Sequence, residues 1–209
     1  WYTYSQEVIG ERLADLLPEM VESALKGLPI PKRMRWADNE FEFVRPVRWI
    51  VALYGEEVIP FNLFNIESGR TTRGHRFHAK EPIVLENADQ YQTRLESEGS
   101  VLVDIEARKA RIKAQIAEAV KPYGEAIVNE GLLNEVTALV EWPVTHIGSF
   151  EEHFLEVPQE ALIIAMEDHQ RYFPIVDKSG NLINKFCFVR NIESNEPETV
   201  IDGHERVIC

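Results

Sequence analysis

Segments with strand-like sequence alternate along this chain with segments of helical periodicity, and this alternation constrains the fold class most. Residues 44–64 predict a strand, a tight turn near Gly55 and a second strand. Residues 105–120 carry apolar side chains at helical spacing and predict an amphipathic helix. A second hairpin is expected over 171–193, with its turn at 178–181. Because hairpins are mixed with helices, we expect an α+β fold with a mainly antiparallel sheet packed with helices.

Further elements follow from the same patterns. Residues 5–27 predict a helix that Pro18 should kink or split. Along the helix 105–120, the cationic side formed by Arg108, Lys109, Arg111 and Lys113 is expected to be solvated. The other expected elements are a strand that includes 73–78, a strand at 83–86, a helix at 88–99, a helix at 131–143 ended by Pro143, a strand at 144–150 and a helix at 157–170.

The prolines at positions 29 and 31 indicate a linker and hence a domain boundary. We expect a helical appendage with its linker over 1–30, an α+β domain over 31–195, and the start of a further helix over 196–209. The chain opens on Trp1 without a methionine and stops within that last helix. It is therefore expected to be a piece of a longer protein.

The charge of the chain is strongly acidic but unevenly distributed. The net charge is −13, from 22 Lys and Arg against 35 Asp and Glu. Residues 32–80 hold nine cations and six acids, which makes this segment +3 and the remainder −16. Such a remainder argues against nonspecific wrapping of DNA or RNA, although one local patch could still contact a polyanion.

The segment RTTRGHRFHAK, residues 70–80, is the only acid-free cationic cluster of that region. Guanidinium groups bind phosphates or carboxylates through paired hydrogen bonds. An equally open alternative is that these cations pair with carboxylates elsewhere in the chain. The cationic residues of the cluster are Arg70, Arg73, Arg76, Lys80, His75 and His78.

Motifs for nucleotide binding and for catalysis are absent from the sequence. There is no GxGxxG, GxxxxGK[ST], GxSxG or HExxH. His75 and His78 are three residues apart but lack a nearby third ligand, so no metal site is expected. The run Asp168-His169-Gln170 is expected to be structural, with His169 or Gln170 capping a helix end or meeting a strand. No catalytic residue is predicted.

The chain is also expected to work in the cytoplasm, away from membranes. Its longest apolar runs, such as 161–166, are far too short to span a bilayer, and no signal peptide is visible. The only cysteines are Cys187 and Cys209, and their spacing is not that of a metal site. Sparse cysteine suits a reducing compartment.

Six blocks of sequence, taken together, resemble the β subunit of the bacterial two-subunit type of glycyl-tRNA synthetase. They occur in that family's order and span nearly all of the chain, within the N-terminal half of that subunit. The blocks are PKRMRW (31–36), FVRPVRWIVALYG (43–55), TTRGHRFH (71–78), NEVTALVEWPV (134–144), MEDHQRYFPIVD (166–177) and RNIES…GHERVI (190–208).

This resemblance implies a function that the motifs alone do not. The family ligates glycine to its tRNA within an α2β2 enzyme, and ATP and magnesium are used on the separate α subunit. The N-terminal half of the β subunit is similar to the B3/B4 domain of the phenylalanyl-tRNA synthetase β subunit. The expected partners are therefore the α subunit and glycine-specific tRNA, with no cofactor bound by this chain itself.

Within that family, the cationic cluster becomes the candidate RNA contact, with Arg73 and Arg76 as its main phosphate ligands. Gly74 between them is expected to allow a tight turn. Two other roles stay open at this point: a hydrolytic editing domain and a subunit-interface scaffold without RNA contact. Editing is disfavoured, because a pocket fitted to glycine already rejects larger side chains by steric clash.

Overall fold

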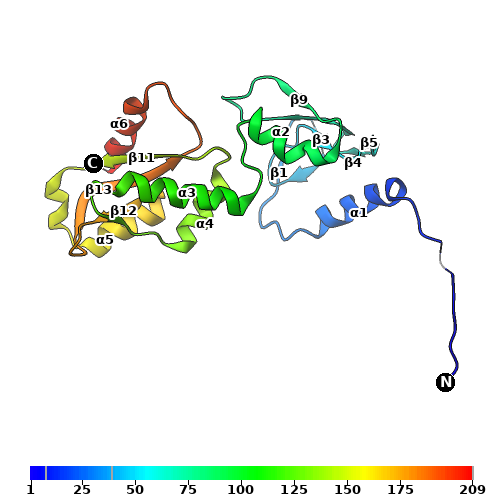
Figure 1. Cartoon of the computed structure of the whole chain (residues 1–209), viewed down its shortest axis with the longest axis horizontal. Coiled ribbons are helices and arrows are strands. Elements are labelled where there is room, and N and C mark those ends of the chain that lie inside the picture. The colour runs from blue at the N-terminus through cyan, green and yellow to red at the C-terminus, as the bar shows by residue number, and fades with distance from the viewer. Residues whose placement is uncertain (8, 39, 209) are drawn as a thin grey trace. The chain divides into compact units, whose positions relative to one another are not determined.

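The computed structural model of the protein describes residues 1–7, 9–38 and 40–208 (Figure 1). The chain forms two compact units. Unit 1 comprises Trp1–Arg73 and Pro82–Tyr91, whereas unit 2 comprises Gly74–Glu81 and the chain from Gln92 onward. The segment 74–81, which connects two strands of unit 1, therefore belongs to unit 2. The expected independent domain over 31–195 stays a prediction.

Unit 1 consists of one long helix and short paired strands. β1 pairs with β2, β4 with β5, β6 with β7 and β8 with β9, all antiparallel, while β3 pairs with β7 in parallel. The predicted turn near Gly55 is confirmed, since it joins β4 to β5 with φ +61°. The elements are α1 (Leu13–Gly27), β1 (Met34–Arg35), β2 (Glu42–Phe43), β3 (Ile50–Val51), β4 (Leu53–Tyr54), β5 (Glu57–Val58), β6 (Asn62–Leu63), β7 (Ile66–Gly69), β8 (Thr71–Arg73), β9 (Pro82–Val84) and η1 (Ala88–Gln90).

The first helix is shorter than predicted. It begins at Leu13 and not at residue 5, and residue 8 lies outside the described part of the chain. Gly10, a poor helix former, lies in the part that does not become helical. Pro18 lies inside α1 without dividing it. None of the side chains of α1 is buried, so the helix contributes no residue to a core.

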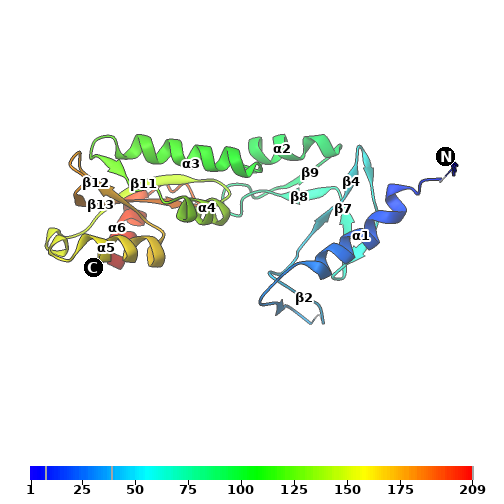
Figure 2. The ribbon, with the colours of Figure 1, turned by 90° about the horizontal axis from the view of Figure 1, so that it is seen from below.

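Unit 2 contains a four-stranded antiparallel sheet between two layers of helices (Figure 2). The strand order is β10-β12-β13-β11. Helices α3 and α4 cover one face, and α5, η3 and α6 cover the other. The elements are α2 (Tyr91–Ser97), whose first residue belongs to unit 1, and then α3 (Ile105–Val120), β10 (Glu125–Ala126), α4 (Glu130–Leu139), β11 (Val144–Ser149), η2 (Glu152–Glu156), α5 (Gln159–Ile164), η3 (Ala165–Gln170), β12 (Phe173–Val176), β13 (Leu182–Arg190) and α6 (Pro197–Ile208).

Alternation along β13 creates two separate cores, because successive side chains of a strand point to opposite faces. Cys187 faces α3 and α4, where it packs with Ile112, Leu133 and Phe173. Phe186 and Phe188 face the other layer of helices. They pack there with Met166, Tyr172 and Leu182, with Leu162, Val200 and Ile201 against them. Burial raises the pKa of the Cys187 thiol to about 12, so this cysteine is an inert core residue.

The helix α3 has the bounds that its periodicity predicts. Asp104 caps it, because the carboxylate accepts a hydrogen bond from the Ala107 amide at 2.7 Å. The expectation that its cationic side is merely solvated is wrong. Arg108 donates to the Leu102 and Thr137 carbonyls, Lys109 and Lys113 pair with Glu130, and Arg111 lies 4.3 Å over the Trp142 ring. The reason is that α4, the loop after it and the backbone directly before α3 lie within reach of these long side chains.

Two of the other predicted elements end earlier than expected, and a third changes its helix type. The strand expected through 73–78 stops at Arg73, where the chain passes into unit 2. The helix expected to reach Pro143 ends at Leu139, because Val140 is already extended. The helix expected over 157–170 is α for one part only and continues as a π-helix over Ala165–Gln170.

The hairpin over 171–193 is confirmed as β12 and β13, with Gly180 at φ +83° in its turn. The strand at 144–150, the strand after Pro82 and the helix near 88–99 are confirmed as β11, β9 and η1 with α2. The α+β class with mainly antiparallel pairing is likewise confirmed. The likeness to the phenylalanyl-tRNA synthetase domain stays a prediction. Of the helices described, none combines the length and apolarity needed to cross a membrane.

Candidate nucleic-acid interface

The boundary between the two units falls within the cationic cluster at residues 70–80. Arg70 and Arg73 belong to unit 1, and the residues from Gly74 to Lys80 belong to unit 2. The cluster is therefore two sets of side chains, each held by its own unit. Their environments divide the six predicted residues into three structural residues and three exposed cations.

Arg70 holds unit 1 together and is half-buried. Its guanidinium donates to the backbone carbonyls of Glu56 at 3.0 Å, Leu85 at 3.3 Å and Glu86 at 3.4 Å. Glu56 precedes β8 in the sequence, and Leu85 and Glu86 follow it. One side chain therefore forms hydrogen bonds to both segments. The contact is with carbonyl oxygens and not with the carboxylates considered as an alternative.

The two histidines connect the segment 74–81 to the end of β13. His75 is only 2% exposed, and its Nε2 lies 2.5 Å from the Asn191 carbonyl oxygen. His78 accepts a hydrogen bond through Nε2 from the Glu193 amide at 3.0 Å, and the two rings stack with centroids 4.5 Å apart. Both rings are thus used to hold the segment in place.

Gly74 has a different role from the predicted turn. A Cβ added there would lie 2.3 Å from both the Cα and the carbonyl oxygen of Gly99. The next amide, that of His75, donates to the Gly99 carbonyl at 2.7 Å. The glycine is needed because two backbone segments cross in contact, and only hydrogen fits between them.

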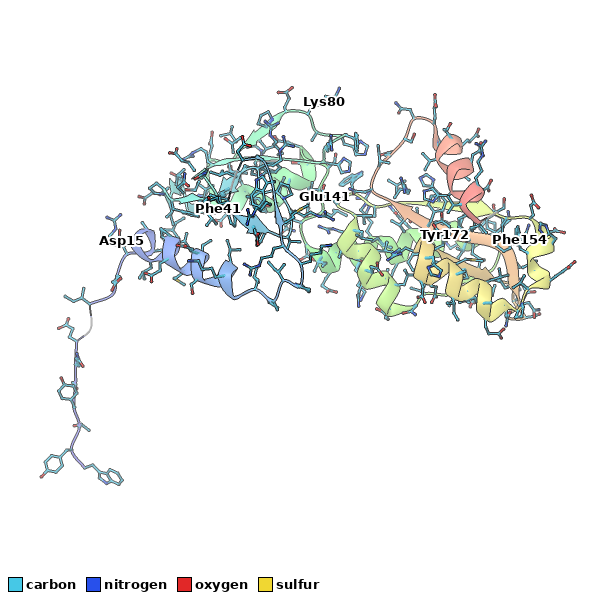
Figure 3. All side chains as sticks on the ribbon, turned by 180° about the vertical axis from the view of Figure 1, so that it is seen from behind. Asp15, Phe41, Lys80, Glu141, Phe154 and Tyr172 are labelled. Atoms are coloured by element: carbon cyan, nitrogen blue, oxygen red, sulfur yellow. The ribbon has the colours of Figure 1, made fainter. Side chains whose placement is uncertain are left out.

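Arg73, Arg76 and Lys80 are the exposed cations of the cluster. Figure 3 shows Lys80 on the loop that leads from β8 to β9. In the described part of the chain none of the three forms an ion pair. The Arg76 guanidinium lies 5.8 Å from the centroid of the Phe77 ring, which is itself 63% exposed. These three side chains are available to an external anion.

Phe77 also lines a pocket of about 370 Å³ in unit 2, at the point where β13 leaves the sheet. We call it the β13 pocket. Apolar side chains from α4 and β13 form much of its wall, and polar ones converge on it from three other segments. Its lining residues are Phe77, Val136, Leu139, Val140, Gln170, Arg171, Tyr172, Phe188, Val189, Arg190, Asn191, Ile192 and His204.

A hydrogen-bonded pair of aromatic side chains lies in this pocket. The Tyr172 hydroxyl is 2.6 Å from Nδ1 of His204, whose ring stacks on Phe188 at 4.1 Å (Tyr172 is labelled in Figure 3). Burial, with the nearby Arg190 and His146 adding to it, lowers the pKa of His204 to about 4. Burial also raises the pKa of Tyr172, against the smaller opposing effect of Arg190. Both groups are therefore neutral at pH 7.

A local backbone irregularity places Tyr172. The π-helix η3 ends at Gln170, and the next residue, Arg171, adopts a left-handed conformation with φ +59°. Its guanidinium donates to the carbonyls of Asp168 at 3.0 Å and His169 at 3.2 Å, and also pairs with Glu135 at 2.8 Å. Arg171 is thus the side chain that caps this helix end, in place of the predicted His169 or Gln170. π-Helical turns are frequent at functional sites.

Sequence reasoning missed the residues of the β13 pocket. His204 occurs on the apolar face of α6, at helical spacing from Val200, Ile201 and Ile208. A histidine on an otherwise apolar face was a signal that could have been followed. Its partner Tyr172 is 32 positions away, so only the fold reveals the pair. Within residues 1–7, 9–38 and 40–208, no three His, Cys, Asp or Glu side chains are grouped to hold a metal ion.

Comparison with known proteins agrees with the resemblance seen in the sequence. The family model described as the glycyl-tRNA synthetase beta subunit matches residues 1–209. Proteins named glycine–tRNA ligase beta subunit from Psychromonas ingrahamii and Pseudoalteromonas atlantica are each 48% identical over 209 residues. The one from Marinobacter nauticus is 46% identical over 210 residues. Each match covers 100% of this chain and 30% of the relative.

The chain thus spans about 30% of the length of the curated relatives it matches. The family match, by contrast, covers every residue of the chain, and the identity is well above the level at which relatedness is in doubt. On this evidence, the chain belongs to the glycyl-tRNA synthetase beta subunit family.

Proposed function

We propose that this chain is the part of a glycine–tRNA ligase β subunit that contacts tRNA phosphates through Arg73, Arg76 and Lys80. The assembled α2β2 enzyme would attach glycine to its tRNA in the cytoplasm, with ATP and magnesium used on the α subunit. This region would support tRNA binding and assembly and be inactive alone. A fold similar to the B3/B4 domain of phenylalanyl-tRNA synthetase is part of the same proposal.

The observation that supports this role most is the exposure of these three cations without an ion pair in the described part of the chain. A chain with a net charge of −13 offers many carboxylates, yet none of those described pairs with Arg73, Arg76 or Lys80. Other basic side chains of unit 2, such as Lys109 and Arg171, are paired. Free guanidiniums on an acidic protein suit a polyanionic partner. Arg73 and Arg76 lie in different units, so each is proposed as a separate phosphate ligand.

The test is the double variant Arg73→Ala plus Arg76→Ala in the full two-subunit enzyme. Each phosphate contact contributes roughly one unit to the slope of log affinity against log salt. We expect the double variant to bind tRNA more weakly and to lose about two units of that slope. Its melting temperature should stay unchanged, because neither guanidinium forms an ion pair within the described chain and Arg76 contacts only the exposed ring of Phe77.

Arg70→Ala is the matched control for this experiment. It removes one guanidinium charge where the double variant removes two, but it also removes three hydrogen bonds to backbone carbonyls. We expect it to lower the melting temperature. An unchanged salt slope in the double variant, together with a lower melting temperature, would assign Arg73 and Arg76 to structure and contradict the proposal.

The β13 pocket does not favour an editing role in place of RNA binding. Hydrolysis needs a group that activates water, and a general base works best with a pKa near the working pH. The pKa of His204 is lowered to about 4, which makes its ring a weak base. The raised pKa of Tyr172 keeps its hydroxyl protonated. The pair is better suited to binding a ligand than to cleaving one.

A further inference from the structure

We propose that the β13 pocket holds one unpaired nucleotide of the bound tRNA, with its base against Phe77 and a phosphate on Arg76 and Arg190. The proposal rests on the proposed function, that this chain binds tRNA. It goes further because it names the part of the RNA that is recognised and the residues that recognise it. All of these residues belong to unit 2.

The stacking surface is the ring of Phe77, at the wall of the pocket. The ring is 63% exposed, and Arg76 lies 5.8 Å from its centroid. An exposed aromatic ring beside a guanidinium is the combination on which unstacked bases are bound in single-stranded RNA. The segment that carries this ring is held in place by His75 and His78, so the surface is fixed before the RNA arrives.

The charge for a phosphate comes from Arg190 and Arg76. Arg190 lines the same pocket as Tyr172 and His204. Its side chain is exposed, and it has no ion pair in the part of the chain that the structure describes. Arg171, also at the pocket, is already paired with Glu135. Arg190 and Arg76 are therefore the cations left free to bind an external phosphate.

Two amide side chains could read the edge of a base. The Oδ1 of Asn191 accepts hydrogen bonds from the Glu141 amide at 2.6 Å and the Trp142 amide at 2.9 Å. Those bonds fix the side chain and leave its N–H groups as donors. The Gln170 amide also lines the pocket and offers both a donor and an acceptor.

The size of the pocket selects for a single nucleotide. About 370 Å³ lies at the lower end of the range of small-molecule sites. A base paired within a duplex cannot enter such a hollow, whereas an unpaired one can. Such a nucleotide could come from the 3′ end of the tRNA or from one of its loops, and both would present the same chemistry.

The test uses the assembled two-subunit enzyme and tRNA that carries 2-aminopurine at one unpaired position. One tRNA carries it in the 3′ end, and a second set carries it in the loops. Stacking on Phe77 should quench the fluorescence in one of these RNAs, which identifies the source of the nucleotide. Phe77→Ala should abolish that quenching and weaken tRNA binding about tenfold, or ~1.4 kcal/mol. Phe77→Trp should retain both.

Tyr123→Ala is the matched control, because Tyr123 is another exposed aromatic of unit 2 with a cation, Lys185, over its ring. It should change neither quenching nor affinity. Arg190→Gln should weaken binding and reduce the salt slope by roughly one unit. Quenching that is the same in Phe77→Ala as in the parent enzyme, or absent at every unpaired position, would overturn the proposal.

The two proposals fail in different ways. If Arg73→Ala plus Arg76→Ala reduces the salt slope while Phe77→Ala changes nothing, the RNA contact holds and the pocket does not bind a nucleotide. If the arginine variants leave tRNA binding unchanged across salt, the RNA contact itself is wrong. Loss of quenching in Phe77→Ala with an unchanged melting temperature supports the pocket directly. A folding defect would instead lower the melting temperature together with the quenching.

Discussion

The Tyr172 hydroxyl and Nδ1 of His204 lie 2.6 Å apart and join the residue directly before β12, a central strand of the sheet, to the helix α6. Each of the two rings also stacks on a buried phenylalanine of β13, Tyr172 on Phe186 and His204 on Phe188. A neutral histidine at this place therefore contributes to the attachment of α6. This contact makes the stability of unit 2 sensitive to pH.

We expect the free energy of unfolding to fall as the pH is lowered from 6.5 towards about 4. In the unfolded chain His204 takes up a proton near pH 6.5, whereas in the fold its pKa is about 4. Between these values the unfolded state binds more protons, so lower pH favours unfolding. Arg190 adds to this effect through its positive charge, and His146 does so when it is protonated, because either charge disfavours protonated His204.

His204→Gln should reduce that pH dependence, because glutamine does not titrate; the part that remains comes from His146, whose pKa is also lowered by burial. Denaturant unfolding at a series of pH values between 4 and 6.5 measures the difference in slope between the two proteins. His153→Gln is the control, since His153 is an exposed residue of η2 and its Nδ1 lies 3.0 Å from a carboxylate oxygen of Glu151. Equal slopes in His204→Gln and the parent chain would show that His204 does not carry the effect.

Gly74→Ala is expected to destabilise the chain by about 1–3 kcal/mol. The new Cβ would lie 2.3 Å from the backbone of Gly99, so one of the two crossing segments must move. Gly69→Ala is the matched control, because a Cβ there meets nothing within 4 Å. Thermal unfolding of the two variants measures the difference, and equal melting temperatures would show that the crossing is not tight.

Removal of residues 1–28 should leave a cooperative unfolding transition. The physical reason is that α1 buries none of its side chains. The strands that follow should therefore retain their pairing without it. The measurement is calorimetric unfolding of the truncated chain beside the parent chain. Loss of the transition on truncation would show that α1 belongs to a core.

Local signals predicted the parts of the fold that local forces decide. The helix α3 has its predicted bounds because Asp104 caps it and its apolar residues recur at helical spacing. The hairpin of β12 and β13 was equally visible, from two apolar runs around Gly180. The end of the strand at Arg73 was not visible, because it depends on where the chain passes between the two units.

The candidate site was predicted only in part, since exposure depends on contacts that are distant in sequence. Arg70, Arg73 and Arg76 look alike in the sequence, yet Arg70 is bound to three carbonyls and the other two are exposed. The carbonyls that bind Arg70 are 14 to 16 positions away. The partner of Tyr172 is 32 positions away, so no local pattern could identify that pair.

The most direct test of RNA contact is site-specific photo-cross-linking to tRNA from position 80 in the assembled two-subunit enzyme. A benzophenone amino acid would replace Lys80, an exposed residue on the segment held by His75 and His78. The control replaces Lys121, an exposed lysine at the far end of α3, which pairs with Glu118. We predict cross-linked tRNA from position 80 and none from position 121. Absence of a cross-link at position 80, in an enzyme that still binds tRNA, would contradict the account.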